Sequence, residues 1–167
     1  MLSLLSKIDP ALERAAVIGQ NLAGTPALGV MQITGGNNNG VYRLDGAHKT
    51  YALKLYRRDA GDPRDRLAAE LAAHAFFARH GVGQVTEMIA SDTEAGAALF
   101  PWIEGKKITA PGEADLDAAM DFIGTLKSLA RQQGARALPL ASEACLSMAE
   151  LAAQISRRHA RLSQVND

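Results

Sequence analysis

One lysine stands out because its neighbours alternate in a way that could bring its charge to an anion. Alternation along residues 51–56 (YALKLY) places Lys54 on one strand face with Ala52 and Tyr56 and leaves the opposite face apolar. A strand covered on both faces would leave this ammonium in need of a counter-charge or an anionic ligand, because a partly buried unpaired charge costs several kcal/mol. The alternative, and the commoner use of such a residue, is an edge-strand lysine that points into solvent.

A carboxylate that could supply the counter-charge follows sixteen positions later on a predicted helix. Glu70 shares a helical stripe with Leu67 and His74, so it faces inward or lies at the border of the buried face. The alternative is a surface pair with Arg66 four residues earlier, which would contribute only about 0.2–0.5 kcal/mol. His74 is interpreted as a packed or solvated side chain, since no paired histidine spacing supports a metal site.

A loop of glycine and asparagine, residues 35–40 (GGNNNG), lies between two predicted strands. Its backbone N–H groups could approach a phosphate closely because small residues leave the main chain accessible. Two familiar phosphate motifs are excluded: Val41 stands where a P-loop requires lysine, and the spacing of a dinucleotide-binding loop is absent. The alternative is a plain β-hairpin turn.

These residues must be positioned by strands and helices that the sequence marks with turn and capping signals. Strands are predicted at 28–34, 41–44, 50–56, 84–91 and 97–103, with a turn at Asp45-Gly46, whose residues tolerate positive φ, and a hairpin turn at 92–96. Helices are predicted after Asp9-Pro10, from Asp62-Pro63 to Gly81, from Glu113, and after a capping box of Ser147 and Glu150.

In order and spacing, these features together resemble the amino-terminal lobe of the kinase-like fold of the aminoglycoside phosphotransferase and choline kinase superfamily. The resemblance implies an α+β fold, with a five-stranded antiparallel sheet, one packed helix, one preceding helix and two or more following helices. It implies a nucleotide-binding lobe at residues 1–104 and the helical start of an incomplete carboxy-terminal lobe at residues 105–167. By the same resemblance the nucleotide-contacting residues are Gly36, Asn37, Asn38, Asn39, Gly40, Ala52, Lys54, Glu70, Pro101, Trp102 and Ile103.

The resemblance assigns each group of residues a role. The loop would cover the phosphates, Lys54 would hold the α- and β-phosphates, and Glu70 would orient Lys54. Residues 99–105 (LFPWIEG) are similar to the segment that joins the two lobes, where the backbone binds adenine. There the Pro101 carbonyl would accept from the adenine amino group and the Ile103 N–H would donate to the ring, while Trp102 has core packing as its alternative.

The family's catalytic loop, a His-Gly-Asp motif followed by Asn, and its later magnesium-binding Asp have no counterpart in this sequence. The resemblance therefore implies the amino-terminal part of an ATP- or GTP-dependent, Mg-dependent phosphotransferase acting on a small-molecule hydroxyl of an aminoglycoside, sugar or amino-alcohol. We expect the chain alone to be inactive, with no catalytic residue and no metal ligand of its own. Two alternatives stay open: a non-catalytic nucleotide-binding or interaction module, and a small α+β fold whose hairpin merely mimics the loop.

Composition limits the partners. With 18 Lys and Arg residues against 18 Asp and Glu residues and no basic stripe, nucleic acid is not expected as a partner. The single Cys145 excludes an internal disulfide, and no apolar run reaches 18 residues, so we expect a cytoplasmic protein without a membrane segment. If the helices from Glu113 onward lack a lobe to pack on, the stripe of Leu116, Met120 and Ile123 should be exposed and could mediate homo-oligomers.

Overall fold

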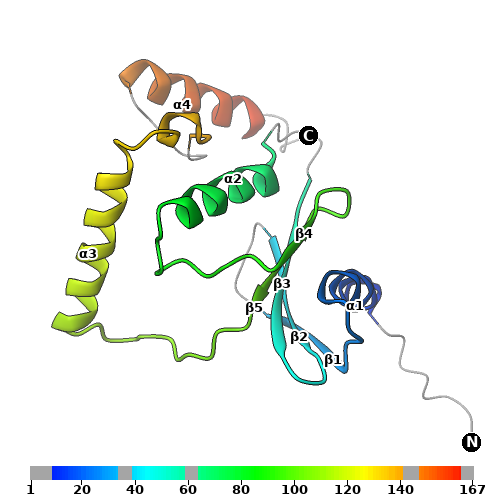
Figure 1. Cartoon of the computed structure of the whole chain (residues 1–167). Coiled ribbons are helices and arrows are strands. Elements are labelled where there is room, and N and C mark those ends of the chain that lie inside the picture. Colours follow the sequence, from blue (N-terminus) through cyan, green and yellow to red (C-terminus); the bar gives the residue numbers. More distant parts are fainter. Residues whose placement is uncertain (1–8, 34–38, 59–63, 141–146, 163–167) are drawn as a thin grey trace, which may run out of the picture.

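A single antiparallel sheet organises the protein, whose computed structural model describes residues 9–33, 39–58, 64–140 and 147–162. The sheet has the order β1-β2-β3-β5-β4. Its strands are β1 (Gly29–Ile33), β2 (Asn39–Asp45), β3 (Thr50–Tyr56), β4 (Ala90–Asp92) and β5 (Ala97–Pro101). The predicted kinase-like α+β fold with a five-stranded antiparallel sheet is confirmed (Figure 1). Because β3 pairs with β2 and β5, Lys54 lies on a central strand, and the edge-strand alternative is wrong.

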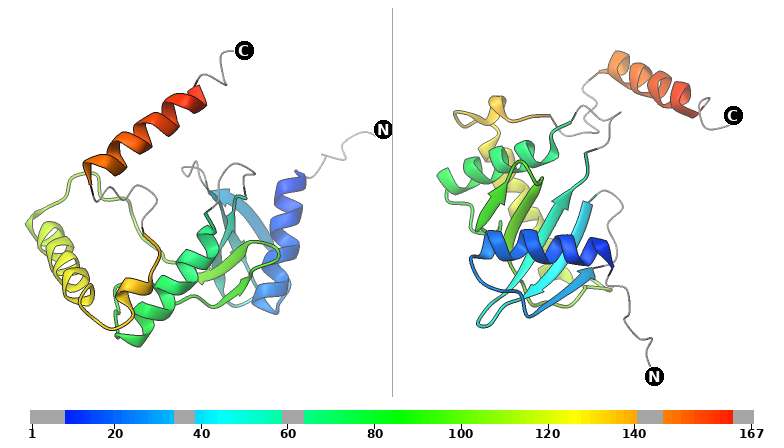
Figure 2. Two further views of the ribbon diagram at one scale, coloured as in Figure 1. Left: turned by 90° about the horizontal axis from the view of Figure 1, so that it is seen from above. Right: turned by 90° about the vertical axis from the view of Figure 1, so that its right-hand side faces the viewer.

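Two helices cover the two faces of this sheet. Helix α1 (Pro10–Ala23) packs on one face, where Ala15 joins Leu44, Leu53 and Leu99 in the larger apolar cluster. Helix α2 (Arg66–Arg79) covers the other face, where its residue Leu67 joins a second cluster of Tyr56, Ala98 and Phe100. Figures 1 and 2 show α1 and α2 on opposite sides of the strands. The sequence predicted one packed helix, and α1 packs on the sheet as well.

The helix starts follow from capping carboxylates. Asp9 accepts from the Ala11 N–H at 2.9 Å and Pro10 occupies the first turn, as predicted. The predicted start of α2 at Asp62-Pro63, residues that lie outside the described ranges, is wrong. Asp65 is the N-cap instead, because its side chain accepts from the Ala68 N–H at 2.8 Å, an N–H that has no partner within the helix.

The two hairpin turns differ from each other in their chemistry. The predicted turn after Asp45 is present, but it does not use the positive φ that Asp45 and Gly46 tolerate: among the described residues only glycines 24, 81, 96 and 134 have positive φ. The β2–β3 turn is closed instead by the Gly46 N–H, which donates to the Lys49 carbonyl at 2.9 Å. In the β4–β5 turn, Gly96 has a φ of +66°, the left-handed region that favours glycine, and Asp92 accepts from two N–H groups of the turn.

Strand β4 is much shorter than the predicted strand at 84–91. Only residues 90–92 pair with β5, in the register Ala90↔Leu99 to Asp92↔Ala97. The Ile89 N–H still donates to the Leu99 carbonyl at 2.8 Å, and residues 84–88 before it form no strand. The alternation of these residues suits an extended chain, but a strand also needs a paired neighbour, and the pairing of β4 with β5 stops at Leu99.

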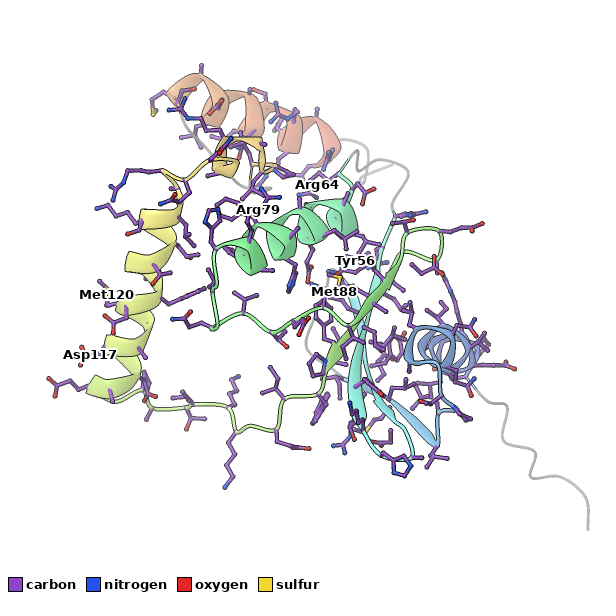
Figure 3. All side chains as sticks on the ribbon, in the orientation of Figure 1. Tyr56, Arg64, Arg79, Met88, Asp117 and Met120 are labelled. Atoms are coloured by element: carbon purple, nitrogen blue, oxygen red, sulfur yellow. The ribbon has the colours of Figure 1, made fainter. Side chains whose placement is uncertain are left out.

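Helices α3 (Glu113–Leu129) and α4 (Met148–Leu162) have no buried residue in the described part of the chain. A short 3-10 helix, η1 (Ala135–Ala137), lies between them in sequence. Leu116, Met120 and Ile123 of α3 are 56%, 64% and 54% exposed, as expected from the sequence for helices that lack a lobe to pack on. Figure 3 labels Met120 on this helix. Within the described residues, no helix combines the length and the apolar character needed to cross a bilayer.

The sheet core yields a stability prediction. Leu99 is fully buried between α1 and the sheet, so Leu99→Ala removes apolar contacts and leaves a cavity. We expect a loss of about 2–5 kcal/mol in the free energy of unfolding, measured by urea denaturation. Leu28→Ala, at a side chain that is 73% exposed, is the matched control and should change stability by less than about 0.5 kcal/mol. Equal losses in the two variants would contradict the assigned core.

Candidate functional site

An ion pair joins the sheet to α2 on the side away from α1. Lys54 Nζ lies 2.5 Å from Glu70 Oε2, and their side chains are 28% and 26% exposed. The two residues are sixteen positions apart in sequence, and Lys54 comes from a central strand whereas Glu70 comes from the helix that covers it. The partly buried ammonium and carboxylate therefore neutralise each other, and the pair holds the Lys54 ammonium between β3 and α2.

Two further rings surround this pair. Lys54 Nζ lies 4.9 Å from the centroid of the Tyr56 ring, within the range of a cation–π interaction. Burial, and then the negative charge of Glu70, raise the pKa of Tyr56 well above its ordinary value, so its hydroxyl stays protonated. On the other oxygen of the carboxylate, His74 Nε2 lies 3.9 Å from Glu70 Oε1, and the His74 ring packs on Phe100 at 5.4 Å. The Glu70 carboxylate is thus confined on both sides.

A cleft of about 380 Å³ opens beside the ion pair. It brings together six of the residues that the sequence singled out: Ala52, Lys54, Glu70, Pro101, Trp102 and Ile103. The remaining lining residues are mostly apolar or aromatic and come from β2, α2, the unpaired segment before β4 and β5: Val41, His74, Val85, Thr86 and Phe100. The cleft therefore combines a lysine that is paired with Glu70 and a largely apolar surface, which suits a flat ligand that carries an anionic group.

The edge of β5 offers backbone groups to this cleft. The Leu99 carbonyl points toward β4, where it accepts from the Ile89 N–H. In a strand, carbonyls two residues apart point to the same side, so the Pro101 carbonyl also faces the side of β4, beyond the last pairing of that strand. The Trp102 N–H donates in the other direction, toward β3, to the Thr50 carbonyl at 3.1 Å. The Pro101 carbonyl is thus an acceptor on the side of β4, next to the cleft that Pro101, Trp102 and Ile103 line.

The described residues of the predicted glycine loop do not line the cleft. Gly36, Asn37 and Asn38 lie outside the described residues, while Asn39 and Gly40 begin β2. These two residues line a different cavity of about 590 Å³ at the end of the sheet, together with Arg14, Arg57 and Arg58. The structure therefore does not bring Asn39 and Gly40 into the cleft that holds Lys54.

Several cleft residues were not singled out by the sequence analysis. Val41 could have been found from strand alternation, because it pairs in register with Lys54 and shares its face. His74 lies four residues after Glu70 on one helix face, and the sequence pattern was interpreted only as that of a packed or solvated side chain. Val85 and Thr86 gave no usable signal, since they come from the segment that was predicted to be a strand. Among the described residues, no three His, Cys, Asp or Glu side chains gather in a way that could hold a metal ion.

Comparisons with known proteins bear on this arrangement. Residues 29–167 match the model of the phosphotransferase enzyme family. Among solved structures, the chain is similar to a candidate fructosamine-3-kinase from Thermobifida fusca, with 18% identity and a TM-score of 0.46. The similarity covers 56% of this chain and 32% of that protein, so the chain spans about a third of the length of this neighbour. A search of curated proteins gave no significant match.

The ion pair yields a second prediction. Glu70→Gln removes the charge that balances Lys54 and leaves a partly buried ammonium with a weaker partner. We expect a loss of about 1–2 kcal/mol in the free energy of unfolding, below the range for fully buried pairs because both side chains retain some contact with water. Glu87→Gln, at an exposed glutamate, is the matched control. If Lys54→Met restores the stability of the Glu70→Gln variant, the loss comes from the unpaired charge; no difference between Glu70→Gln and its control would contradict the pair.

Proposed function

The chain belongs to the phosphotransferase enzyme family, and from this premise we propose that its cleft binds the nucleotide that donates a phosphoryl group to a small-molecule hydroxyl. The resemblance to the aminoglycoside phosphotransferase superfamily that the sequence predicted is confirmed by the family match. The observation that carries the proposal is the Lys54–Glu70 pair, which holds one ammonium at 2.5 Å from its carboxylate beside an apolar cleft. A nucleotide presents the matching chemistry, a flat base and an anionic phosphate chain.

In this proposal each cleft residue has one task. Lys54 binds the α- and β-phosphates, and Glu70 keeps its ammonium in place. Val41 and Ala52, which share the strand face of Lys54, pack against the base. The Pro101 carbonyl accepts from the amino group of adenine and the Ile103 N–H donates to its ring. ATP fits this donor and acceptor pattern, and GTP remains the other candidate for the test.

The rest of the phosphotransfer machinery is assigned to residues outside this chain. Phosphoryl transfer needs a metal ion that bridges the phosphates and a positioned acceptor hydroxyl. The sequence contains no His-Gly-Asp catalytic motif, and the described residues hold no cluster suited to Mg²⁺. We therefore propose that this chain alone binds nucleotide without transferring phosphate, and that a complete cytoplasmic enzyme acts on an aminoglycoside, a sugar or an amino-alcohol such as choline.

Helix α3 supports the assignment of residues 105–167 to the start of a second lobe. Its apolar stripe of Leu116, Met120 and Ile123 is more than half exposed, although side chains of this kind ordinarily pack against a partner. A missing lobe would cover this stripe. In the competing proposal, a self-sufficient binding or interaction module, the same stripe would be the contact of one defined dimer.

Nucleotide binding is the first prediction of the proposal. At a concentration about 100 times the dissociation constant, ATP should stabilise the chain by about 2.7 kcal/mol, because it binds only the folded state. Lys54→Met should reduce this stabilisation strongly, since it removes the phosphate-binding charge. Lys49→Met, at an exposed lysine in the β2–β3 turn, is the matched control and should behave like the wild type. The measurement is thermal unfolding with ATP, GTP and inorganic phosphate in parallel, and an unchanged melting temperature at millimolar nucleotide would overturn the proposal.

The state of association separates the two proposals for α3. If the stripe lacks its lobe, the chain should form polydisperse oligomers, and Met120→Lys should make it monomeric by placing a charge on that face. Light scattering coupled to size-exclusion chromatography measures this directly. One defined dimer that Met120→Lys dissociates would favour the interaction module instead.

A further inference from the structure

Five side chains form a network at the end of the cleft where β5 runs into residues 102–104. Arg43 donates from Nε to Asp45 Oδ1 at 2.9 Å, and Thr50 donates to the same oxygen at 3.1 Å. The Arg43 guanidinium also lies over the Trp102 ring, 5.1 Å from its centroid. Trp102 in turn donates from Nε1 to Glu104 Oε1 at 3.0 Å, and Arg43 Nη1 lies 4.0 Å from that oxygen. We call these five residues the Arg43 network.

The register of the sheet explains why the Arg43 network meets the cleft. Arg43 pairs with Ala52, and Ala52 pairs with Phe100, so these residues form a row across β2, β3 and β5. Arg43 is two residues from Val41 and therefore shares its strand face, the face that lines the cleft. From there it reaches Trp102, whose N–H is held by the Thr50 carbonyl at 3.1 Å. The network therefore forms a wall at one end of the cleft.

The contacts fix Trp102 from three directions. Its backbone is bonded to β3, its indole N–H is bonded to Glu104, and its ring is covered by a cation that Asp45 holds in place. The Asp45 carboxylate accepts hydrogen bonds from Arg43 and Thr50. The bond from Arg43 has the larger effect, and together they hold the pKa of Asp45 below its ordinary value, although desolvation acts to raise it. The carboxylate thus stays charged and keeps the guanidinium oriented at neutral pH. Pro101 and Ile103, the neighbours of Trp102, line the cleft.

We propose that Arg43 is a positioning residue, which holds the 101–103 backbone in the geometry that binds the base of the nucleotide. This inference rests on the proposed nucleotide function and adds to it a residue that does not line the cleft. Arg43 acts through Trp102, because a donor and an acceptor separated by one residue recognise a base only when the peptide between them is held still. Lysine cannot replace it, since only the planar guanidinium can stack on the ring and bond to a carboxylate at the same time.

The test uses Trp102 as its own reporter, because it is the single tryptophan of the chain. Arg43→Gln should increase acrylamide quenching of the Trp102 emission, since the ring loses its cover. It should also weaken ATP binding by about threefold to tenfold, the size expected from losing a cation–π contact and its ion pairs. Arg43→Lys should behave like Arg43→Gln. Arg131→Gln, at an exposed arginine that follows α3, is the matched control and should change neither measurement.

The outcomes separate this inference from the proposed function. If the wild-type chain binds ATP and Arg43→Gln raises quenching without weakening ATP binding, the network is structural only and the positioning role is overturned. Unchanged quenching in Arg43→Gln overturns it as well, because Arg43 would not cover the ring. Absence of ATP binding by the wild type overturns both proposals. Glu104→Ala provides a second variant if Arg43→Gln does not fold: its side chain is 80% exposed, and it should reproduce both effects in weaker form.

Discussion

A lysine ammonium that is largely withdrawn from water must be paired, and much of this structure follows from where its partner lies. Lys54 is on a central strand, so neither sheet edge gives it a route to solvent. Its counter-charge has to come from an element that crosses the face of the sheet, and α2 is that element. Leu67 and Leu71 pack α2 on the sheet, and Glu70 lies between them in sequence, 2.5 Å from the ammonium.

The two faces of the sheet have different tasks. The face toward α1 is continuous apolar packing, with Leu44, Leu53 and Leu99 almost completely buried, and it stabilises the strands. The face toward α2 interleaves apolar residues with Lys54 and leaves a cleft beside the ion pair. Because side chains alternate along a strand, the same strands form both faces of the sheet. The packed core on the α1 face therefore holds the strands in place, and the strands position Lys54 on the α2 face.

Sequence patterns predicted those features that depend on short-range rules. Alternation in β3 assigned Lys54 to its face, and helical spacing placed Glu70 on the inner side of α2, because both periods are local. The predicted start of α2 and the predicted length of β4 were wrong for different reasons. Two aspartates, Asp62 and Asp65, carry similar capping signals, and only the fold decides between them. Strand length depends on whether a neighbour is present, which no local pattern reveals, and the packing of α1 on the sheet has the same long-range origin.

The shortness of β4, which the sequence did not predict, leaves part of the β5 edge unpaired next to the cleft. Had pairing with β5 continued past Leu99, the Pro101 carbonyl would have been drawn toward a neighbouring strand. Because β4 begins only at Ala90, the Pro101 carbonyl lies beyond the pairing of β4 with β5, next to the cleft that residues 101–103 line. An unpaired backbone edge can recognise a ligand only if it is held still. Among the described residues, no strand pairs with residues 101–103 on the β4 side. The Arg43 network supplies this support from the opposite side, through Trp102, and leaves the recognising edge uncovered.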